Sequence, residues 1–78
     1  MTTFERISFN PQVMGGQACL RGTRVPVSIV LKLVAGGMTT DDILRDYPYL
    51  EAADVQQALA YGAWLASEHI LPAHTHVA

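Results

Sequence analysis

A turn-rich segment, residues 15–27 (GGQACLRGTRVPV), separates two parts of the chain with different sequence patterns. Glycine adopts positive φ without steric penalty, so Gly15, Gly16 and Gly22 permit tight reversals here. Pro26 fixes its own φ and disfavours helical geometry at the preceding residue, so a helix can begin only at or after it. The segment therefore excludes one continuous helix. It predicts a short extended arm before it and helices after it.

The part before this segment holds short apolar pieces that predict an N-terminal β arm. Ile7 and Phe9 alternate with polar residues, which indicates a strand with both side chains on one face. Val13-Met14 and residues 18–20 lie on either side of two glycines and are typical of the extended pieces of a hairpin. Because a lone hairpin is marginal in water, the arm must pack on the helices or pair with a second copy of itself.

Two helices are predicted directly after the proline. Residues 27–35 (VSIVLKLVA) are apolar on nearly all sides, which is typical of a helix buried on more than one face. Thr39 can cap the next helix, and Asp42, three residues later, occupies the return position of a capping box. This second helix is predicted to run to about Tyr47, where Pro48 stops it.

A third and longer helix is predicted from about Ala52 to His69. Glu51 stands at its cap position with Asp54 three residues on, although glutamate caps less well than serine or threonine. Residues of small or apolar type recur on one face of this segment: Val55, Ala58, Leu59, Gly62 and Ala66.

Together these elements predict one small, mainly α-helical domain. It comprises a β arm and hinge in residues 1–26, a three-helix bundle in residues 27–71 and a flexible tail in residues 72–78. The second and third helices, joined through residues 48–50, have the proportions of a helix-turn-helix. Periodicity alone does not show that such a pair binds DNA, because small three-helix bundles also serve as interaction modules.

The composition favours association with another chain. Half of the 78 residues are apolar and only 15% are charged, which is more apolar surface than a small monomer easily hides. The net charge of −2 argues against strong, sequence-independent binding to nucleic acid. A single cysteine, Cys19, excludes an intrachain disulfide and fits a reducing compartment. No apolar run is long enough to span a bilayer, so we expect no membrane association and a cytoplasmic protein.

These pieces together resemble the DUF433 family of small prokaryotic proteins. The residues that carry the resemblance are Ile7, Asn10-Pro11, Gly15-Gly16, LRGTRVPV at 20–27, GMT at 37–39, DIL at 42–44, YPYL at 47–50, Asp54-Val55 and ALAY at 58–61. The resemblance implies a homeodomain-like three-helix bundle with an N-terminal β arm. Many members resemble the antitoxin half of toxin–antitoxin pairs that are encoded beside a PIN-like nuclease. The family supplies no catalytic residues, and Glu51 departs from the threonine-type cap that is frequent at this position.

The basic residues of the hinge have two interpretations. Arg21 and Arg24 could contact phosphate or an acidic partner, or they could hold the hinge by hydrogen bonding carbonyls and carboxylates. The hinge role is favoured for Arg24, and both roles stay open for Arg21. Lys32 is a further candidate contact to nucleic acid or to an acidic partner.

The early part of the third helix would be the recognition surface of a DNA-binding protein. Gln56 and Gln57 are candidates there, because glutamine can read the edge of adenine. No lysine or arginine follows Glu51, however, and phosphate contacts provide much of the affinity of such helices. A solvated helix face is therefore favoured over base readout.

Aromatic residues mark the candidate interface. Tyr61, Trp64 and Leu65 lie beside the apolar stripe of the third helix, and aromatic residues are enriched at interface centres. A small bundle also needs apolar residues for its own core, and the interface is slightly favoured because the chain is so apolar. We predict a symmetric homodimer through this face and the arm around Ile7 and Phe9.

Catalytic and metal sites find no support in the sequence. His69, His74 and His76 suggest metal ligands, but a solvated tail without cysteine ligands is the favoured interpretation. Cys19 lies in an apolar context that favours an inert, packed thiol. No histidine, serine or carboxylate pair has a spacing that requires chemistry, so we expect a non-enzymatic protein without a cofactor.

The leading functional hypothesis is an antitoxin-like protein that binds and neutralises a cognate PIN-like nuclease. It rests on the family resemblance and on the excess apolar surface. The first alternative is a helix-turn-helix repressor that binds operator DNA, with its own operon as one candidate target. The second is a structural homodimer with another role.

Overall fold

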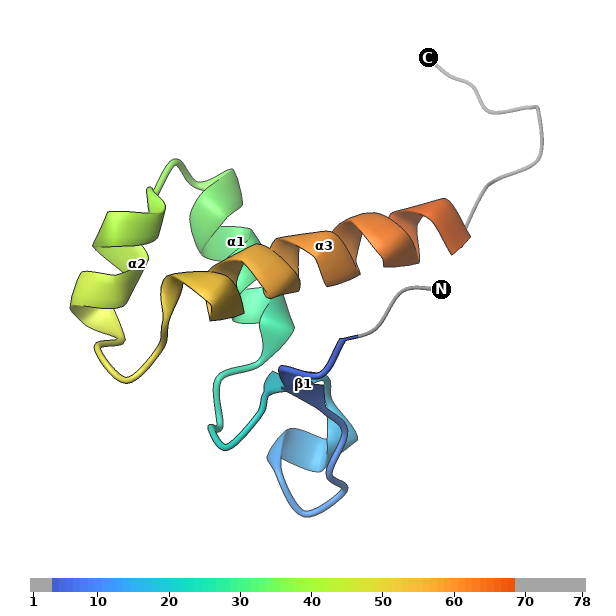
Figure 1. Ribbon diagram of the computed structural model, residues 1–78. Coiled ribbons are helices and arrows are strands. Elements are labelled where there is room, and N and C mark those ends of the chain that lie inside the picture. The colour runs from blue at the N-terminus through green and yellow to red at the C-terminus, as the bar shows by residue number, and fades with distance from the viewer. Residues whose placement is uncertain (1–3, 69–78) are drawn as a thin grey trace.

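The computed structural model describes residues 4–68, which form three helices and one small hairpin (Figure 1). The elements in chain order are strand β1 (Ile7–Ser8), the 3₁₀ turn η1 (Met14–Gly16), strand β2 (Cys19–Leu20) and helices α1 (Val27–Ala35), α2 (Thr40–Asp46) and α3 (Ala52–Glu68). The protein is therefore mainly helical, as the sequence predicts. His69 and the predicted tail, residues 72–78, lie outside the described residues.

The hairpin differs from the prediction in which segments it pairs. Strand β1 runs antiparallel to β2, with Ile7 opposite Leu20. Val13-Met14 is not a strand, and that part of the prediction is wrong. Met14 adopts positive φ (49°) and the N–H of Val13 donates to the carbonyl of Asn10 at 2.8 Å. Consecutive turns through residues 10–16 replace an extended ladder because each closes a local hydrogen bond.

A tight turn after β2 leads the chain into α1. The N–H of Thr23 donates to the carbonyl of Leu20 at 3.0 Å, and Gly22 supplies the positive φ (79°) that the turn requires. The Thr23 hydroxyl donates to the same carbonyl and accepts from the N–H of Val25. Pro26 then stands at the N-cap of α1, so the expectation that no helix begins before the proline is confirmed.

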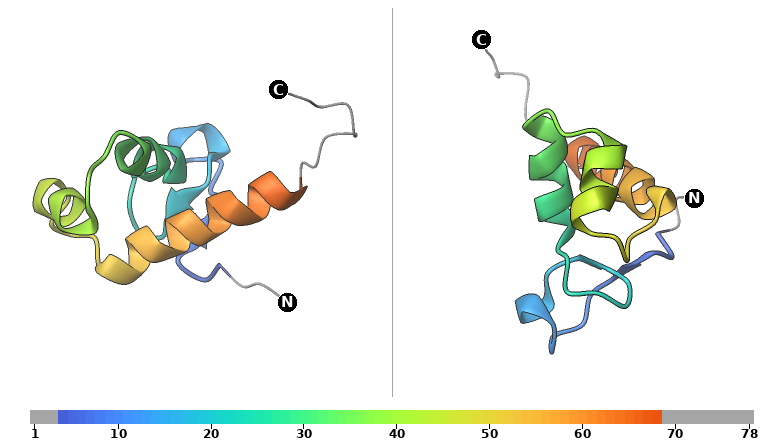
Figure 2. Two further views of the ribbon diagram at one scale, coloured as in Figure 1. Left: turned by 90° about the horizontal axis from the view of Figure 1, so that it is seen from above. Right: turned by 90° about the vertical axis from the view of Figure 1, so that its left-hand side faces the viewer.

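The core lies where the hairpin and the three helices meet, and it is aliphatic. Helix α1 crosses α3 closely at Gly62, where an added Cβ would stand 2.9 Å from a methyl group of Leu31. In Figures 1 and 2 the hairpin packs on one side of the α1–α3 pair and α2 lies near the N-terminal end of α3. The buried apolar residues are Ile7, Cys19, Leu20, Val25, Val27, Val30, Ile43, Leu50, Val55 and Ala58.

The starts of α2 and α3 follow the predicted cap signals to different degrees. Thr39 Oγ1 accepts from the N–H of Asp42, and the Asp42 carboxylate accepts from the N–H of Thr39, both at 3.1 Å, so the capping box is confirmed. Before α3, Asp54 accepts from the N–H of Glu51 at 2.8 Å, while the Glu51 carboxylate contacts an arginine of the arm instead.

The apolar stripe of α3 is confirmed only in its first half. Val55 and Ala58 are buried and Leu59 is partly buried, but Ala66 is exposed. The last turns of α3 extend past α1 and α2 (Figure 1), and Ala66 and Ser67 there are exposed. Among the described residues, no helix has the length and apolar character needed to cross a membrane.

Candidate interaction surfaces

The aromatic side chains of the described residues lie outside the buried core. Phe9, Tyr49 and Trp64 are 58%, 64% and 40% exposed. Phe4, Tyr47 and Tyr61 pack against the core but stay partly exposed. Large aromatic side chains usually provide much of the apolar burial of a domain. In this protein all six rings keep some exposed surface, and Phe9, Tyr49 and Trp64 keep the most.

Four of these rings form one cluster, which we call the aromatic face: Phe4, Phe9, Tyr61 and Trp64. Phe4 packs its edge against Tyr61, with ring centroids 5.1 Å apart and planes at 87°. Phe9 reaches the same tyrosine at 6.0 Å, and Trp64 lies 5.7 Å from Phe4 and 6.0 Å from Tyr61. The face therefore joins the arm to the middle of α3, and both parts fix its shape.

An apolar groove of about 330 Å³ lies beside this face, between the hairpin, α1 and α3. Phe9 and Tyr61 belong to both the face and the groove. The groove is lined by Phe9, Gly16, Gln17, Ala18, Val27, Ser28, Leu31, Tyr61 and Leu65. No Asp, Glu, His, Lys or Arg side chain is among these lining residues.

The structure separates the two arm residues that the sequence placed together. Ile7 is only 3% exposed and belongs to the core, whereas Phe9 is 58% exposed. Strand β1 ends at Ser8, so the alternation that would keep both side chains on one face stops there. The prediction of a shared face is therefore wrong, and Ile7 has almost no surface to offer a partner. Phe9, Tyr61, Trp64 and Leu65 do lie together around the face and the groove.

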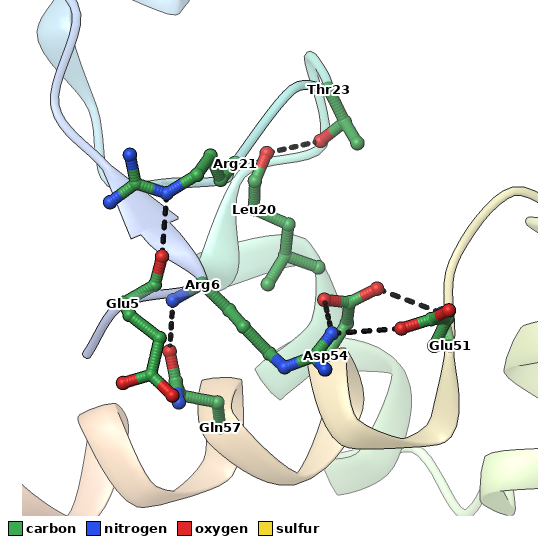
Figure 3. Close-up of polar contacts among 8 residues, drawn as sticks. All are labelled: Glu5, Arg6, Leu20, Arg21, Thr23, Glu51, Asp54 and Gln57. Carbon is green, nitrogen blue, oxygen red and sulfur yellow. Dashed lines mark hydrogen bonds and ion pairs between the residues drawn. The ribbon is translucent and has the colours of Figure 1, made fainter. Parts of the chain in front are cut away.

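Arg6 attaches the arm to the start of α3, a role that no local pattern in the sequence predicts. Its Nη1 contacts Glu51 Oε1 and Asp54 Oδ1, each at 3.0 Å, and its main-chain N–H donates to Gln57 Oε1 (Figure 3). The carboxylates of Glu51 and Asp54 raise the pKa of Arg6 above its ordinary value. The only available signal was one cation in the arm and two acids at the start of a helix, more than 40 residues apart.

This contact weakens the case for base readout by α3. The amide oxygen of Gln57 accepts a hydrogen bond from the N–H of Arg6, so it is not free to contact the edge of a base. Gln56 is exposed and lines a shallow hollow with Ala53 and Ala60. The cation nearest this end of the helix, Arg6, is paired with carboxylates. Lys32 is exposed in the last turn of α1, on a different helix.

The structure assigns the hinge role to Arg21, for which the sequence left both roles open, and not to Arg24, for which that role was favoured. Arg21 holds the hairpin, because its Nε donates to the carbonyl of Glu5 and its Nη2 to that of Ile7. Arg24 makes no hydrogen bond or ion pair within the described residues, and its predicted hinge role is wrong. The carbonyl of Leu20 in this turn already accepts from Thr23, which leaves that acceptor occupied.

A second hollow of about 510 Å³ lies at this turn, and we call it the polar hollow because two arginines line it. It is lined by Arg21, Gly22, Thr23, Arg24 and Tyr49, and it shares none of these residues with the groove.

The predicted inert thiol has the expected placement. Cys19 is free and buried in the hairpin. Within residues 4–68, no three His, Cys, Asp or Glu side chains gather as metal ligands would. His69, His74 and His76 lie outside the described residues.

Fold and surfaces together define a small helical protein with a β hairpin and an exposed aromatic face. The chain belongs to the DUF433 family, described as proteins of unknown function, whose sequence pattern matches residues 7–62. An uncharacterized protein of Sinorhizobium fredii, y4eO, is 37% identical over 57 residues, which cover 73% of this chain. This chain spans only 26% of that protein.

A solved structure shows the same fold. The crystal structure of a DUF433 member protein from Anabaena variabilis matches with a TM-score of 0.74 and 33% identity. The match covers 81% of this chain and 62% of the other. The arrangement of helices and hairpin is therefore shared with that protein.

Proposed function

We propose that this protein is a non-enzymatic, antitoxin-like partner that binds and neutralises a PIN-like nuclease. The observation that carries the proposal is the aromatic face with its adjoining apolar groove. Helices α2 and α3 serve in this proposal as a homeodomain-like scaffold that holds the face.

The chemistry of the face favours a protein as its occupant. Exposed aromatic side chains that cluster beside an apolar pocket provide most of the binding energy in many interfaces. Phe9 and Trp64 present apolar surface to solvent, while Phe4 and Tyr61 hold them in fixed positions. A preorganised face loses little side-chain entropy when a partner binds.

The arm is part of the same binding surface. Phe4 and Phe9 come from the arm, and Arg6 between them is tied to Glu51 and Asp54 of the α3 region. The ion pairs therefore keep the arm rings against Tyr61. Loss of this attachment would separate the two halves of the face.

A homodimer is the proposed assembly of the chain in the absence of the nuclease. Two copies that meet through the aromatic face would cover the apolar surface of both, and two-fold closure is the commonest soluble arrangement. The same face cannot be covered by two occupants at once, so the nuclease and the second copy compete for it.

Operator DNA is less well supported as a ligand of α3. Glu51 and Asp54 place negative charge at the start of the helix, and Gln57 is occupied by the arm. Repressor activity through this helix stays a prediction without an observation in its favour.

Co-expression with the nuclease encoded by the adjacent open reading frame tests the proposal. We expect the two chains to co-purify and the nuclease to lose its toxicity to growing cells. Phe9→Ala and Trp64→Ala should each weaken binding by about 2 kcal/mol or more, which is a factor of about 30.

Tyr49→Ala is the matched control for these variants. Tyr49 is as exposed as Phe9 but lies at the polar hollow, so its removal should leave nuclease binding unchanged. The proposal fails if no nuclease neighbours the gene and none co-purifies from the native host. Equal losses in all three variants would also count against the aromatic face as the binding surface.

A further inference from the structure

The unpaired positive charge of the described chain is concentrated at one place. The sequence has five basic residues, and Arg6 and Arg45 are paired with carboxylates. Arg21, Arg24 and Lys32 form no ion pair within residues 4–68. Two of these three line the polar hollow, and no acidic residue lines it. In a protein of net charge −2, this is a local site of positive potential.

Arg24 is the donor that this hollow leaves available. Neither its guanidinium nor its main-chain N–H has a hydrogen-bond partner in the described chain, and the N–H of Gly22 has none either. Thr23 is not available, because its hydroxyl already donates to Leu20 and accepts from Val25. The Nε of Arg21 donates to the carbonyl of Glu5 (Figure 3). Arg21 therefore contributes positive charge and part of the wall of the hollow, while its Nε is already paired.

The other wall of the hollow is an aromatic ring. Tyr49 is 64% exposed, which makes it the most exposed large apolar side chain of the described residues. Tyr47 packs against it edge to face, with centroids 6.3 Å apart and planes at 86°. Pro48 between them limits the backbone freedom of the loop. The ring of Tyr49 is thereby held in place while much of its surface stays open to solvent.

An arginine and an exposed aromatic ring in one hollow suit a ligand that has both a phosphate and a base. Guanidinium groups bind phosphate oxygens through paired N–H donors. Aromatic rings provide stacking platforms for unpaired bases, so a ligand with a base can use the ring as well as the arginine. The volume of about 510 Å³ is within the range of small-ligand sites.

We propose that the hollow formed by the turn at residues 21–24 and by Tyr49 binds one nucleotide unit of a single-stranded nucleic acid. Arg24 and the free amides of the turn contact the phosphate, and the base stacks on Tyr49. The contact is short, because residues 4–68 hold no further run of unpaired lysines or arginines that could follow a strand. The site is separate from the aromatic face and does not depend on nuclease binding.

Fluorescence anisotropy with a fluorescein-labelled, mixed-sequence 12-mer single strand tests this site. The full chain is titrated at several salt concentrations around 0.1 M. One neutralised phosphate predicts that log K falls with log salt with a slope of about −0.7. Arg24→Gln should weaken binding about tenfold and flatten this slope. Tyr49→Ala should weaken binding at least about fivefold and leave the slope unchanged.

Lys32→Gln is the matched control, because it removes one exposed, unpaired charge that does not line the hollow. Screening over about 10 Å at 0.1 M salt should limit its effect to less than about twofold. Thermal unfolding monitored by circular dichroism checks that all variants are folded. Because Arg24 has no partner within the described chain, its replacement should not alter stability.

Several results would overturn the proposal. The first is no binding by the wild-type chain at low salt, and the second is an equal loss in Arg24→Gln and Lys32→Gln. The third is displacement of the strand by poly-glutamate as readily as by unlabelled strand, which would define a site for any anion. Tighter binding of the matching duplex would exclude stacking on an unpaired base.

Discussion

Replacement of Trp64 by alanine separates an interface role from a role in the core. Trp64 is 40% exposed, and its covered part packs against Phe4 and Tyr61. A fully buried tryptophan removes up to about 250 Å² from water, so about 150 Å² is covered here. At about 25 cal/mol per Å² this corresponds to at most about 4 kcal/mol.

The expected loss of stability is smaller than this limit. Unfolded chains already cover part of their apolar surface and alanine retains some contact, which lowers the expectation to about 2–3 kcal/mol. Leu20 is smaller but fully buried, and Leu20→Ala should cost about 3–5 kcal/mol. A chain of 78 residues has a total stability of about 4–12 kcal/mol. Trp64→Ala should therefore fold, and Leu20→Ala should be close to unfolding.

Urea unfolding gives the free energy of unfolding of both variants. It is followed by circular dichroism rather than by tryptophan fluorescence, because Trp64→Ala removes the single tryptophan of the sequence. Light scattering at tens of micromolar then gives the mass. We expect a wild-type dimer and a folded, monomeric Trp64→Ala. A wild-type mass near 8.5 kDa would refute the dimer. A Trp64→Ala protein that is less stable than Leu20→Ala would refute the assignment of Trp64 to the surface.

Three further predictions concern the capping box and the arm. Thr39→Ala removes the cap of α2 and should cost about 1 kcal/mol in urea unfolding, whereas Thr40→Ala should have little effect. Hydrogen bonds from Thr39, and secondarily from Arg45, lower the pKa of Asp42 in the folded protein. The Asp42 carboxylate therefore stabilises the fold above the ordinary aspartate pKa of about 3.9. This stabilisation is lost as the pH falls through the lower pKa of the folded state. Asp42→Asn should therefore lose less stability than wild type in unfolding curves between pH 5 and pH 2. Arg6→Met should destabilise the arm at 0.01 M salt but less so at 1 M salt, where the ion pairs are screened, and equal losses at both would contradict this.

Local signals in the sequence determined where each helix begins and where the chain turns. Pro26 fixes the start of α1 through its own backbone geometry. Thr39 and Asp42 fix the start of α2 through hydrogen bonds that span three residues. Gly22 permits the turn after β2 because it adopts positive φ. Such features depend on the chemistry of a few neighbouring residues, so their positions are readable without a structure.

The choice of exposed and buried side chains required the tertiary structure. Ile7 and Phe9 are two residues apart, the spacing of side chains on one face of a strand, yet only Ile7 lies in the core opposite Leu20. Arg21 and Arg24 flank the same turn in the sequence, but only Arg21 donates hydrogen bonds to carbonyls of the arm.

The attachment of Arg6 to Glu51 and Asp54 joins segments 45 and 48 residues apart. No local propensity encodes such a contact, because it forms only after the hairpin has packed on α3. The sequence by itself thus determined the turns and helix starts, which local hydrogen bonds and backbone sterics control. Tertiary packing decided which aromatic rings and which arginine remained exposed, because burial depends on where distant segments of the chain meet.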